Sequence, residues 1–294
     1  QDGLADLFQR SVERHLASDV PIGAFLSSGV DSSAIVGAMG RTAKERSNTL
    51  TVTFPDAPAY SEGEEAERWA AAVGTRHAAV PVSGDDLLKM LPEALAAQDQ
   101  PTSDGINTYA VSRAAREAGL TVALSGLGGD ELFGGYPSFR DVPKCLKWRR
   151  WLGKAAPFIG AGIGRLRGEY DRRAAKMTDL LTCRENVEEV YRARRRVFSP
   201  KQSRLLLSGY QELETSGAWR GACVERESFP PFCADSEMLS AADPIDAVGL
   251  LDLSFYMRNQ LLRDSDCMSM ACSLEIRVPF LDADFAMAAW QCGT

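Results

Sequence analysis

The sequence predicts an α/β fold in which a parallel sheet carries helices on both faces and a mainly helical half follows. Up to residue 136, short apolar runs alternate with segments of helical periodicity, the pattern of repeated strand-helix-strand units. Beyond Tyr136 the strand signals fade and helical patterns remain. We therefore expect a nucleotide-binding-type α/β region over residues 1–136 and a mainly helical remainder over residues 137–294.

The individual elements follow from the same periodicities. An amphipathic helix is expected over residues 2–17, where apolar side chains recur at near-helical spacing. The apolar runs expected as strands cover residues 21–26, 50–54, 77–82 and 120–124. Helices are expected over residues 32–43, 61–73, 85–97, 107–118, 184–197 and 247–273. Ser61, followed three residues later by Glu64, predicts a capping box at the start of the helix over residues 61–73.

Composition and charge exclude several classes of protein. Of the 294 residues, 45% are hydrophobic and 25% are charged, which is typical of a folded globular chain. The net charge of −7 argues against general binding to nucleic acid. Residues 140–204 nevertheless hold 18 Lys or Arg against 7 Asp or Glu. This excess indicates either solvated helix faces, the interpretation we favour, or a docking surface for an acidic partner.

Targeting, redox and metal signals are sparse. The longest uncharged apolar stretch, residues 155–164, has about half of the ~20 residues that span a membrane, and the first residues lack a secretory hydrophobic core. We therefore expect no membrane association and a cytoplasmic location. The 7 cysteines contain no C-x-x-C and are expected to be reduced thiols, and His15 and His77 are expected to be structural. Because the chain does not begin with Met, we expect a processed form or an excised part of a longer protein.

The first candidate site is the segment SSGVDSS over residues 27–33, directly after an expected strand and at the start of an expected helix. A tight turn there aims backbone N–H groups and the positive helix end at one point, which suits phosphate oxygens. Asp31 is a candidate metal ligand. No Gly-Lys-Ser/Thr follows, so this is not a Walker A loop, and a plain strand-to-helix connection remains an alternative for this segment alone.

The second candidate site is the segment SGLGGDELFGGY over residues 125–136, again directly after an expected strand. Its five glycines suit a backbone that wraps a ligand closely, and they frame the adjacent acids Asp130 and Glu131. Ligands bind at the carboxyl ends of parallel strands, where both segments would lie. Asp31 and Asp130 could then share a Mg²⁺ ion bound to a triphosphate.

The third candidate site covers residues 263–282 and combines many ionisable groups with a Pro turn. From pattern alone it is either a salt-bridge lattice or the wall of a site. Met268 and Met270 are expected to pack in the core.

At these three sites the sequence resembles a known family. The segments AFLSSGVDSS, LSGLGGDELFGGY and SMACSLEIRVPFLD occur in the order found in the ATP-dependent synthetase domain of glutamine-hydrolysing asparagine synthetases and their relatives. The resemblance spans almost the whole chain. It implies an adenine-nucleotide α-hydrolase-like fold, with an ATP-pyrophosphatase region over residues 1–136 and the helical remainder of the same domain over residues 137–294.

The resemblance also implies an AMP-forming carbon–nitrogen ligase. The carboxylate of aspartate or a related acid attacks the α-phosphate of ATP and pyrophosphate leaves, after which ammonia or an amine displaces AMP. The residues implied to hold pyrophosphate are Ser27, Ser28, Gly29, Val30, Asp31 and Ser32. Those implied to contact AMP are Leu26, Val52, Ser125 and Gly126. Asp31 and Asp130 would hold Mg²⁺, and the expected catalytic groups are Asp130, Glu131, Glu275 and Arg277, the last two as base and carboxylate anchor for the acceptor.

Four departures from the family pattern keep alternatives open. The first loop reads SSGVDS where the family has Ser-Gly-Gly, and Leu127 stands where asparagine synthetases carry an acidic residue. The sequence as given contains neither an amino-terminal glutaminase domain nor the family's Lys-bearing loop, so we expect poor turnover of this part alone. Leucine cannot transfer protons, which favours relatives similar to β-lactam synthetases, lasso-peptide cyclases or other amidotransferases. A nucleotide-binding scaffold without turnover is the alternative of a different class. The expected partners are a small carboxylate, ammonia or an amine, a glutaminase domain and, in a homodimer, a second copy.

Overall fold

The computed structural model describes residues 2–42, 46–102, 104–167, 171–200, 202–203, 239 and 242–292. The chain divides into two compact units. Unit 1 comprises Gln1–Phe133 and Tyr256–Thr294, and unit 2 comprises Gly134–Phe255. The predicted α/β fold class is confirmed, because unit 1 holds a five-stranded parallel sheet with packed helices.

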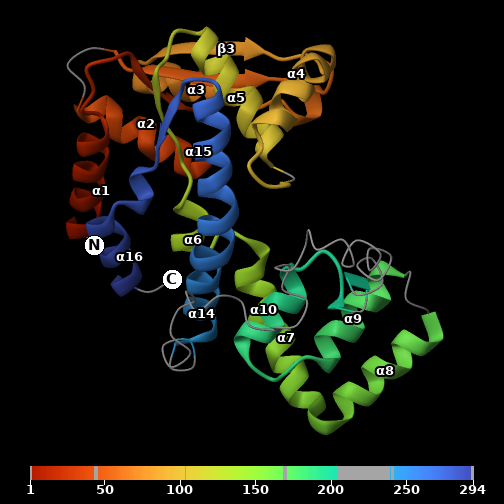
Figure 1. The fold of residues 1–294 in the computed structure, drawn as a ribbon. Helices are drawn as coiled ribbons and strands as arrows, with labels where there is room; N and C mark the ends of the chain where they lie inside the picture. The colour runs from red at the N-terminus through yellow and green to blue at the C-terminus, as the bar shows by residue number, and fades with distance from the viewer. Residues whose placement is uncertain are drawn as a thin grey trace, which may run out of the picture. The chain divides into compact units, whose positions relative to one another are not determined.

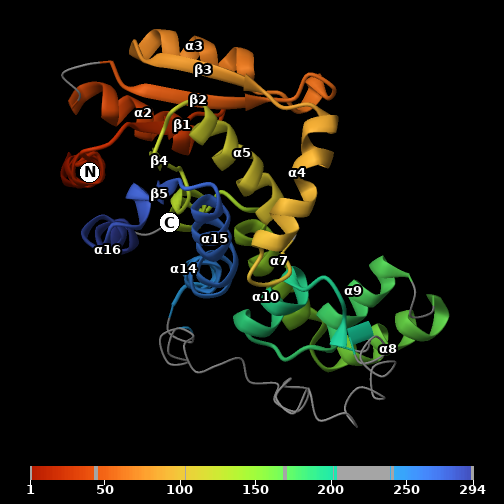
Figure 2. The same cartoon turned by 45° about the horizontal axis from the view of Figure 1, so that its top comes forward.

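The sheet of unit 1, whose outer strand β3 is labelled in Figure 1, has the strand order β3-β2-β1-β4-β5, which the labels of Figure 2 follow. The strands are β1 (Ile22–Phe25), β2 (Asn48–Thr53), β3 (Arg76–Pro81), β4 (Val122–Leu124) and β5 (Glu275–Arg277). All neighbouring pairs are parallel. Ala24 in the central strand is opposite Thr49 on one side and Leu124 on the other, and its side chain is fully buried. The four predicted strands are therefore all present.

The helices of unit 1 fall on two sides because the direction of winding reverses. They are α1 (Asp2–His15), α2 (Val30–Thr42), α3 (Gly63–Val73), α4 (Gly84–Ala97), α5 (Gly105–Glu117), α6 (Gly129–Phe133), α15 (Leu262–Ala271) and α16 (Ala283–Cys292). From β1 the chain moves outward through β2 to β3, and it then returns to β4 and β5 on the opposite side of β1. Since crossovers between parallel strands are right-handed, α2 and α3 cover one face and α4, α5 and α15 cover the other. The contacts agree, since α2 packs on α3, and α5 packs on both α4 and α15. Figure 2 shows α5 beside α4.

One predicted helix cap is wrong and another is present. Ser61 makes no capping box with Glu64; α3 begins at Gly63, and Glu62 takes the N-cap position with no side-chain cap bond. A capping box lies instead at α4, where the Ser83 hydroxyl accepts a hydrogen bond from the Asp86 N–H at 3.1 Å. The Asp86 carboxylate accepts one in return from the Ser83 N–H, also at 3.1 Å.

The third candidate segment contains a strand that the sequence pattern did not predict. After α15 ends at Ala271, Ser273 adopts a positive φ of 57°, and residues 275–277 then pair with β4. A 3-10 turn, η4 (Pro279–Leu281), leads into α16. Met268 is 1% exposed and lies in the core as expected, whereas the prediction for Met270 is wrong because it is 56% exposed.

Unit 2 is helical. Its helices are α7 (Pro137–Leu152), α8 (Ala156–Arg167), α9 (Arg172–Thr182), α10 (Val187–Arg195) and α14 (Pro244–Leu251). A π-helical segment, η3 (Asp252–Leu261), continues from α14, and its residues from Tyr256 onward belong to unit 1. The core between α7, α10 and α14 includes Leu146, Val190 and Leu251. The fully buried Asp252 carboxylate accepts hydrogen bonds from the hydroxyls of Tyr191 and Ser138 at 2.6 and 2.9 Å and pairs with Arg195.

Other expectations concern membrane-spanning helices, the cysteine thiols and the two histidines. Among the described residues, no helix is both long and apolar enough to cross a bilayer. Cys145, Cys183, Cys267, Cys272 and Cys292 are free thiols, while Cys223 and Cys233 lie outside the described residues. The Nδ1 atom of each histidine lies within hydrogen-bond distance of a polar group. His15 Nδ1 lies 2.8 Å from the Ser11 carbonyl, and His77 Nδ1 lies 3.0 Å from the Thr49 hydroxyl.

Candidate functional site

The loops that follow β1 and β4 lie side by side at the carboxyl edge of the sheet. β1 and β4 are neighbours, and between them the strand order changes direction. Such a switch point is where open α/β sheets bind ligands, because the two loops leave in opposite directions and open a crevice. The structure thus brings together the first two candidate segments.

The loop after β1 is held in shape by its own hydroxyl groups. The Ser27 N–H donates to the Ser32 hydroxyl at 3.1 Å, and the two hydroxyls lie 2.9 Å apart. The Gly29 N–H donates to the Ser27 hydroxyl at 3.1 Å. Val30 begins α2, so the N–H groups of its first turn have no intrahelical acceptor. The loop therefore presents backbone donors beside the positive end of α2, as an anion site requires.

The loop after β4 lies directly against Asp31. A Cβ atom at Gly126 would lie 3.1 Å from the Asp31 Cβ and 3.1 Å from the Ser32 nitrogen. A Cβ atom at Gly129 would lie 2.6 Å from Oδ1 of Asp31 and nearer still to its other carboxylate atoms. These two glycines are therefore required by close approach, and the glycine-rich composition allows the loop to surround the Asp31 carboxylate.

Asp31 and Asp130 form a carboxylate pair. Burial, and secondarily the charge of Asp130, raises the pKa of Asp31 from 3.8 to about 6. Asp130 itself is exposed, while the adjacent Glu131 is 1% exposed and faces the interior. Of the two neighbouring acids, Asp130 is thus the one that is open to solvent and interacts electrostatically with Asp31.

The donor set of this pair suits Mg²⁺ better than a transition metal. Within the described ranges, no group of three or more His, Cys, Asp or Glu side chains gathers as a metal site. Mg²⁺ is held by one or two carboxylates together with phosphate oxygens and water. A cation between Asp31 and Asp130 would also offset the repulsion from Asp130, which after burial is the lesser of the two causes that raise the pKa of Asp31.

The residues expected to contact AMP lie at or near the carboxyl ends of β1, β2 and β4. Leu26 is 2% exposed, and its carbonyl accepts a hydrogen bond from the Thr51 hydroxyl at 2.5 Å. Val52, on the neighbouring β2, packs half-buried against the apolar core. Ser125 continues β4, since its N–H donates to the Arg277 carbonyl at 2.8 Å. Leu127 is half-buried in the turn that follows.

Glu275 and Arg277 contact each other and α1. The Arg277 guanidinium donates to Oε1 of Glu275 at 2.8 Å and to the carbonyls of His15 and Ala17 at 2.8 and 2.7 Å. His15 is the last residue of α1 and Ala17 follows that helix, and both precede β1, so their carbonyls lie toward the amino edge of the sheet, opposite the two loops. The structure therefore does not gather the Arg277 side chain with Asp31 and Asp130. Glu275 also lines a cavity of 270 Å³ between α15 and β5, beside Ser265 and Asp266.

Sequence reasoning missed Glu62. Its Oε2 accepts a hydrogen bond from the Ser28 N–H at 3.2 Å, so a carboxylate from the start of α3 reaches the loop after β1. An exposed acid at a helix N-terminus usually indicates only a favourable charge at the helix dipole. No local signal could distinguish this long-range contact.

Comparison with known proteins identifies the family of the chain. The sequence profile described as asparagine synthase matches residues 3–293. The chain belongs to the asparagine synthase family. A putative glutamine-hydrolysing asparagine synthetase of Mycobacterium tuberculosis is 34% identical over 300 residues, covering 98% of this chain and 42% of the relative. Asparagine synthetase 1 of Bacillus subtilis, also glutamine-hydrolysing, is 30% identical over 289 residues, covering 94% of this chain and 41% of the relative.

The family likeness extends to proteins with other names. An amidase, chry2, of Gibberella zeae is 26% identical over 154 residues, covering 47% of this chain and 23% of that protein. The chain of this asparagine synthase family member spans about two fifths of the length of the M. tuberculosis and B. subtilis relatives.

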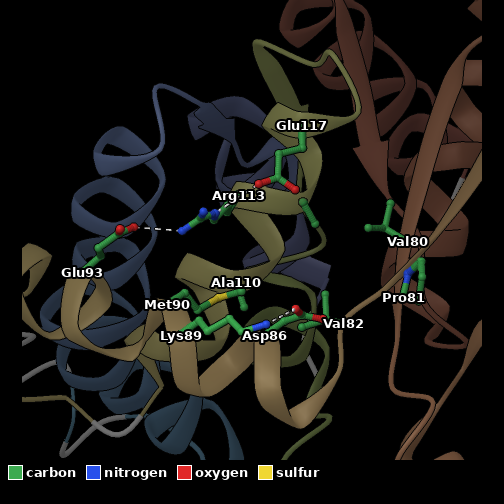
Figure 3. Close-up of a pocket in the computed structure, with 11 residues that line it drawn as sticks. Val80, Pro81, Val82, Asp86, Lys89, Met90, Glu93, Ala110, Arg113 and Glu117 are labelled. Carbon is green, nitrogen blue, oxygen red and sulfur yellow. Dashed lines mark hydrogen bonds and ion pairs between the residues drawn. The ribbon is translucent and has the colours of Figure 1, made fainter.

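A separate cavity of about 420 Å³ in this family member lies between β3, α4 and α5 (Figure 3). Its floor is apolar and includes Val82, Met90 and Ala110. Its rim charges pair with one another: Arg113 contacts Glu93 at 2.8 Å and Glu117 at 3.1 Å, and Lys89 lies 4.0 Å from Asp86. The cavity residues belong to neither of the two loops at the switch point.

Proposed function

We propose that unit 1 binds Mg-ATP at the loops after β1 and β4 and is the synthetase part of an amide-forming, AMP-producing ligase. The observation that carries this proposal is the enclosure of Asp31 by Gly126 and Gly129, which joins an anion-binding loop to a carboxylate pair at one crevice. Membership of the asparagine synthase family supports it.

The loop residues have distinct roles in this proposal. The segment from Ser27 to Ser32 holds the β- and γ-phosphates through the Ser28 N–H and the N–H groups of the first turn of α2. Leu26, Val52, Ser125 and Gly126 form the walls around adenosine. Asp31 and Asp130 hold Mg²⁺. When bound, this ion offsets negative charge on the departing pyrophosphate. Backbone N–H donors also stabilise this negative charge, because they are already oriented and need no reorganisation as the charge develops.

The substrate is proposed to be a small carboxylic acid. Attack of its carboxylate on the α-phosphate forms an acyl-adenylate and breaks the α–β bridging bond, so pyrophosphate leaves. Ammonia or an amine then displaces AMP. The relatives are named as glutamine-hydrolysing enzymes, which supports ammonia from a glutaminase domain in the full-length protein. For Glu275 and Arg277, contact with the acceptor stays a prediction.

Leu127 favours an acid other than free aspartate as the substrate. Its side chain cannot accept or donate a proton, and it occupies the turn between Ser125 and the metal-binding segment. Amide formers similar to β-lactam synthetases or lasso-peptide cyclases are therefore the second candidate.

The test is pyrophosphate release by the full-length protein with ATP, Mg²⁺, ammonia and a panel of acids. We expect release that depends on a carboxylic acid and weak asparagine formation from aspartate. Leu127→Glu should raise asparagine formation, because a proton-transferring group is worth ~10²–10⁴ in rate. Leu127→Gln is the matched control of equal size and should not raise it. Strong asparagine formation by the unaltered protein would exclude the second candidate. Binding of ATP with no pyrophosphate release in the presence of any acid would indicate a nucleotide-binding scaffold.

A further inference from the structure

The N–H groups of the loop after β1 differ in what they bind. Those of Ser27 and Gly29 donate to hydroxyls of the loop itself. That of Ser28 donates to the carboxylate of Glu62, 34 residues away in sequence. An anion thus already contacts one of the donors proposed to hold phosphate.

The start of α3 is positioned so that Glu62 reaches this donor. Gly63 packs so tightly on the end of β2 that a Cβ atom there would lie 2.7 Å from Cγ2 of Thr53. The Trp69 indole N–H donates to the Ser33 carbonyl at 3.3 Å, which ties α3 to α2. Although Glu62 is the N-cap residue of α3, its side chain makes no cap bond. Its carboxylate is directed to another loop instead of its own helix.

We propose that the Glu62 carboxylate binds reversibly to the loop after β1, at a position that a phosphate group of the nucleotide takes when it binds. In the free protein it takes the place on the Ser28 N–H that a phosphate oxygen takes when nucleotide binds. This inference rests on the proposed function. Two anions cannot accept the same hydrogen bond, so phosphate binding requires Glu62 to leave, and its charge then remains beside the phosphates. Glu62 therefore weakens the affinity for ATP and favours the departure of pyrophosphate.

Exchanging the Glu62 carboxylate for a phosphate costs little free energy, because both Ser28 and Glu62 are open to water. Ser28 and Glu62 are exposed, so each can be solvated during the exchange. A hydrogen bond between exposed groups contributes little net free energy, and a neighbouring charge in water adds a similarly small amount. Removing the Glu62 carboxylate should therefore tighten phosphate binding by about 3–10-fold.

The experiment compares Glu62→Ala with Glu65→Ala in the full chain by isothermal titration. Glu65 is an equally exposed acid in the first turn of the same helix and serves as the charge-matched control. The ligands are Mg-ATP, Mg-pyrophosphate and adenosine. We expect Glu62→Ala to tighten both phosphate ligands by about 3–10-fold and Glu65→Ala by less than about twofold. Adenosine, which has no phosphate, should bind both variants as it binds the unaltered protein.

Other outcomes overturn the inference in distinguishable ways. Equal tightening of phosphate binding by both variants would show that Glu62 acts only as a long-range negative charge. Weaker phosphate binding by Glu62→Ala would show that Glu62 instead stabilises the phosphate-binding conformation of the loop. A parallel change in adenosine affinity would indicate a structural effect. If the unaltered protein binds Mg-ATP and Glu62→Ala leaves its affinity unchanged, only this inference fails. If it binds neither phosphate ligand, the proposed function fails as well.

Discussion

The backbone of Gly129 lies against the Asp31 carboxylate so closely that a methyl group at position 129 would come within 2.6 Å of Oδ1. Neither residue can move freely, since Gly129 begins α6 and Asp31 lies in the first turn of α2. The contact therefore fixes the carboxylate in the crevice between the loops. The dependence of the site on this contact can be measured directly.

Gly129→Ala should destabilise the protein by about 1–3 kcal/mol, because a methyl group forced into a packed site displaces its neighbours. It should also weaken Mg-ATP binding, since Asp31 must move. Gly37→Ala, in the interior of α2, is the matched control: apart from the nearby backbone of its own helix and its chain neighbours, no atom lies within 4 Å of its new Cβ, so stability should rise by about 0.5–1 kcal/mol. Urea unfolding measures both changes. A Gly129→Ala protein as stable as the Gly37→Ala protein would contradict the close approach.

Asp31→Asn should stabilise the ligand-free protein near pH 7.5. Because the pKa of Asp31 is raised from 3.8 to about 6 in the folded state, the folded protein favours the protonated carboxyl. Its contribution to stability is complete below the unfolded value and is lost as pH rises through about 6. After a discount for partial exposure, the loss amounts to about 1–2 kcal/mol at neutral pH.

Urea unfolding of both proteins without Mg²⁺, at pH 4 and at pH 7.5, tests this prediction. The stability difference between Asp31→Asn and the unaltered protein should appear mainly at the higher pH. A difference that is the same at both pH values would rule out a raised pKa at Asp31.

The two serines at helix starts should respond differently to replacement by alanine. Ser83 caps α4 through a reciprocal pair of hydrogen bonds with Asp86, so Ser83→Ala should cost about 1 kcal/mol. Ser61 does not cap α3, so Ser61→Ala should change stability by less than about 0.5 kcal/mol. The midpoint of urea unfolding compares the two. A larger loss at position 61 would restore the cap that the sequence predicts.

The sequence predicted those features of the fold that depend on local pattern. The strands around Ala24 and Leu124 are apolar runs bounded by turns, and their carboxyl ends were expected to meet because parallel strands end at one edge. β5 escaped prediction because its three residues, Glu275 to Arg277, include two charges and pair with β4 across 150 intervening residues. Only tertiary pairing makes that segment a strand.

In the candidate site, too, residues marked by a local sequence pattern could be predicted, and residues placed by tertiary packing could not. Asp31 and Asp130 could be selected because each follows a strand and a glycine-rich turn. Glu62 could not, because its contact with Ser28 depends on the packing of α3 against the end of β2. The contacts of Arg277 with the carbonyls of His15 and Ala17 depend likewise on how α1 is placed.

The most direct test of the account is isothermal titration of Mg-ATP into the full chain and into its Asp130→Ala variant. Asp130 is exposed, so its replacement should leave the thermal unfolding midpoint nearly unchanged while a metal ligand is lost. We predict one Mg-ATP site in the unaltered chain and an affinity at least about tenfold weaker in the variant. No binding to the unaltered chain, or equal affinity in a folded variant, would contradict the assignment of the crevice between the β1 and β4 loops as the Mg-ATP site.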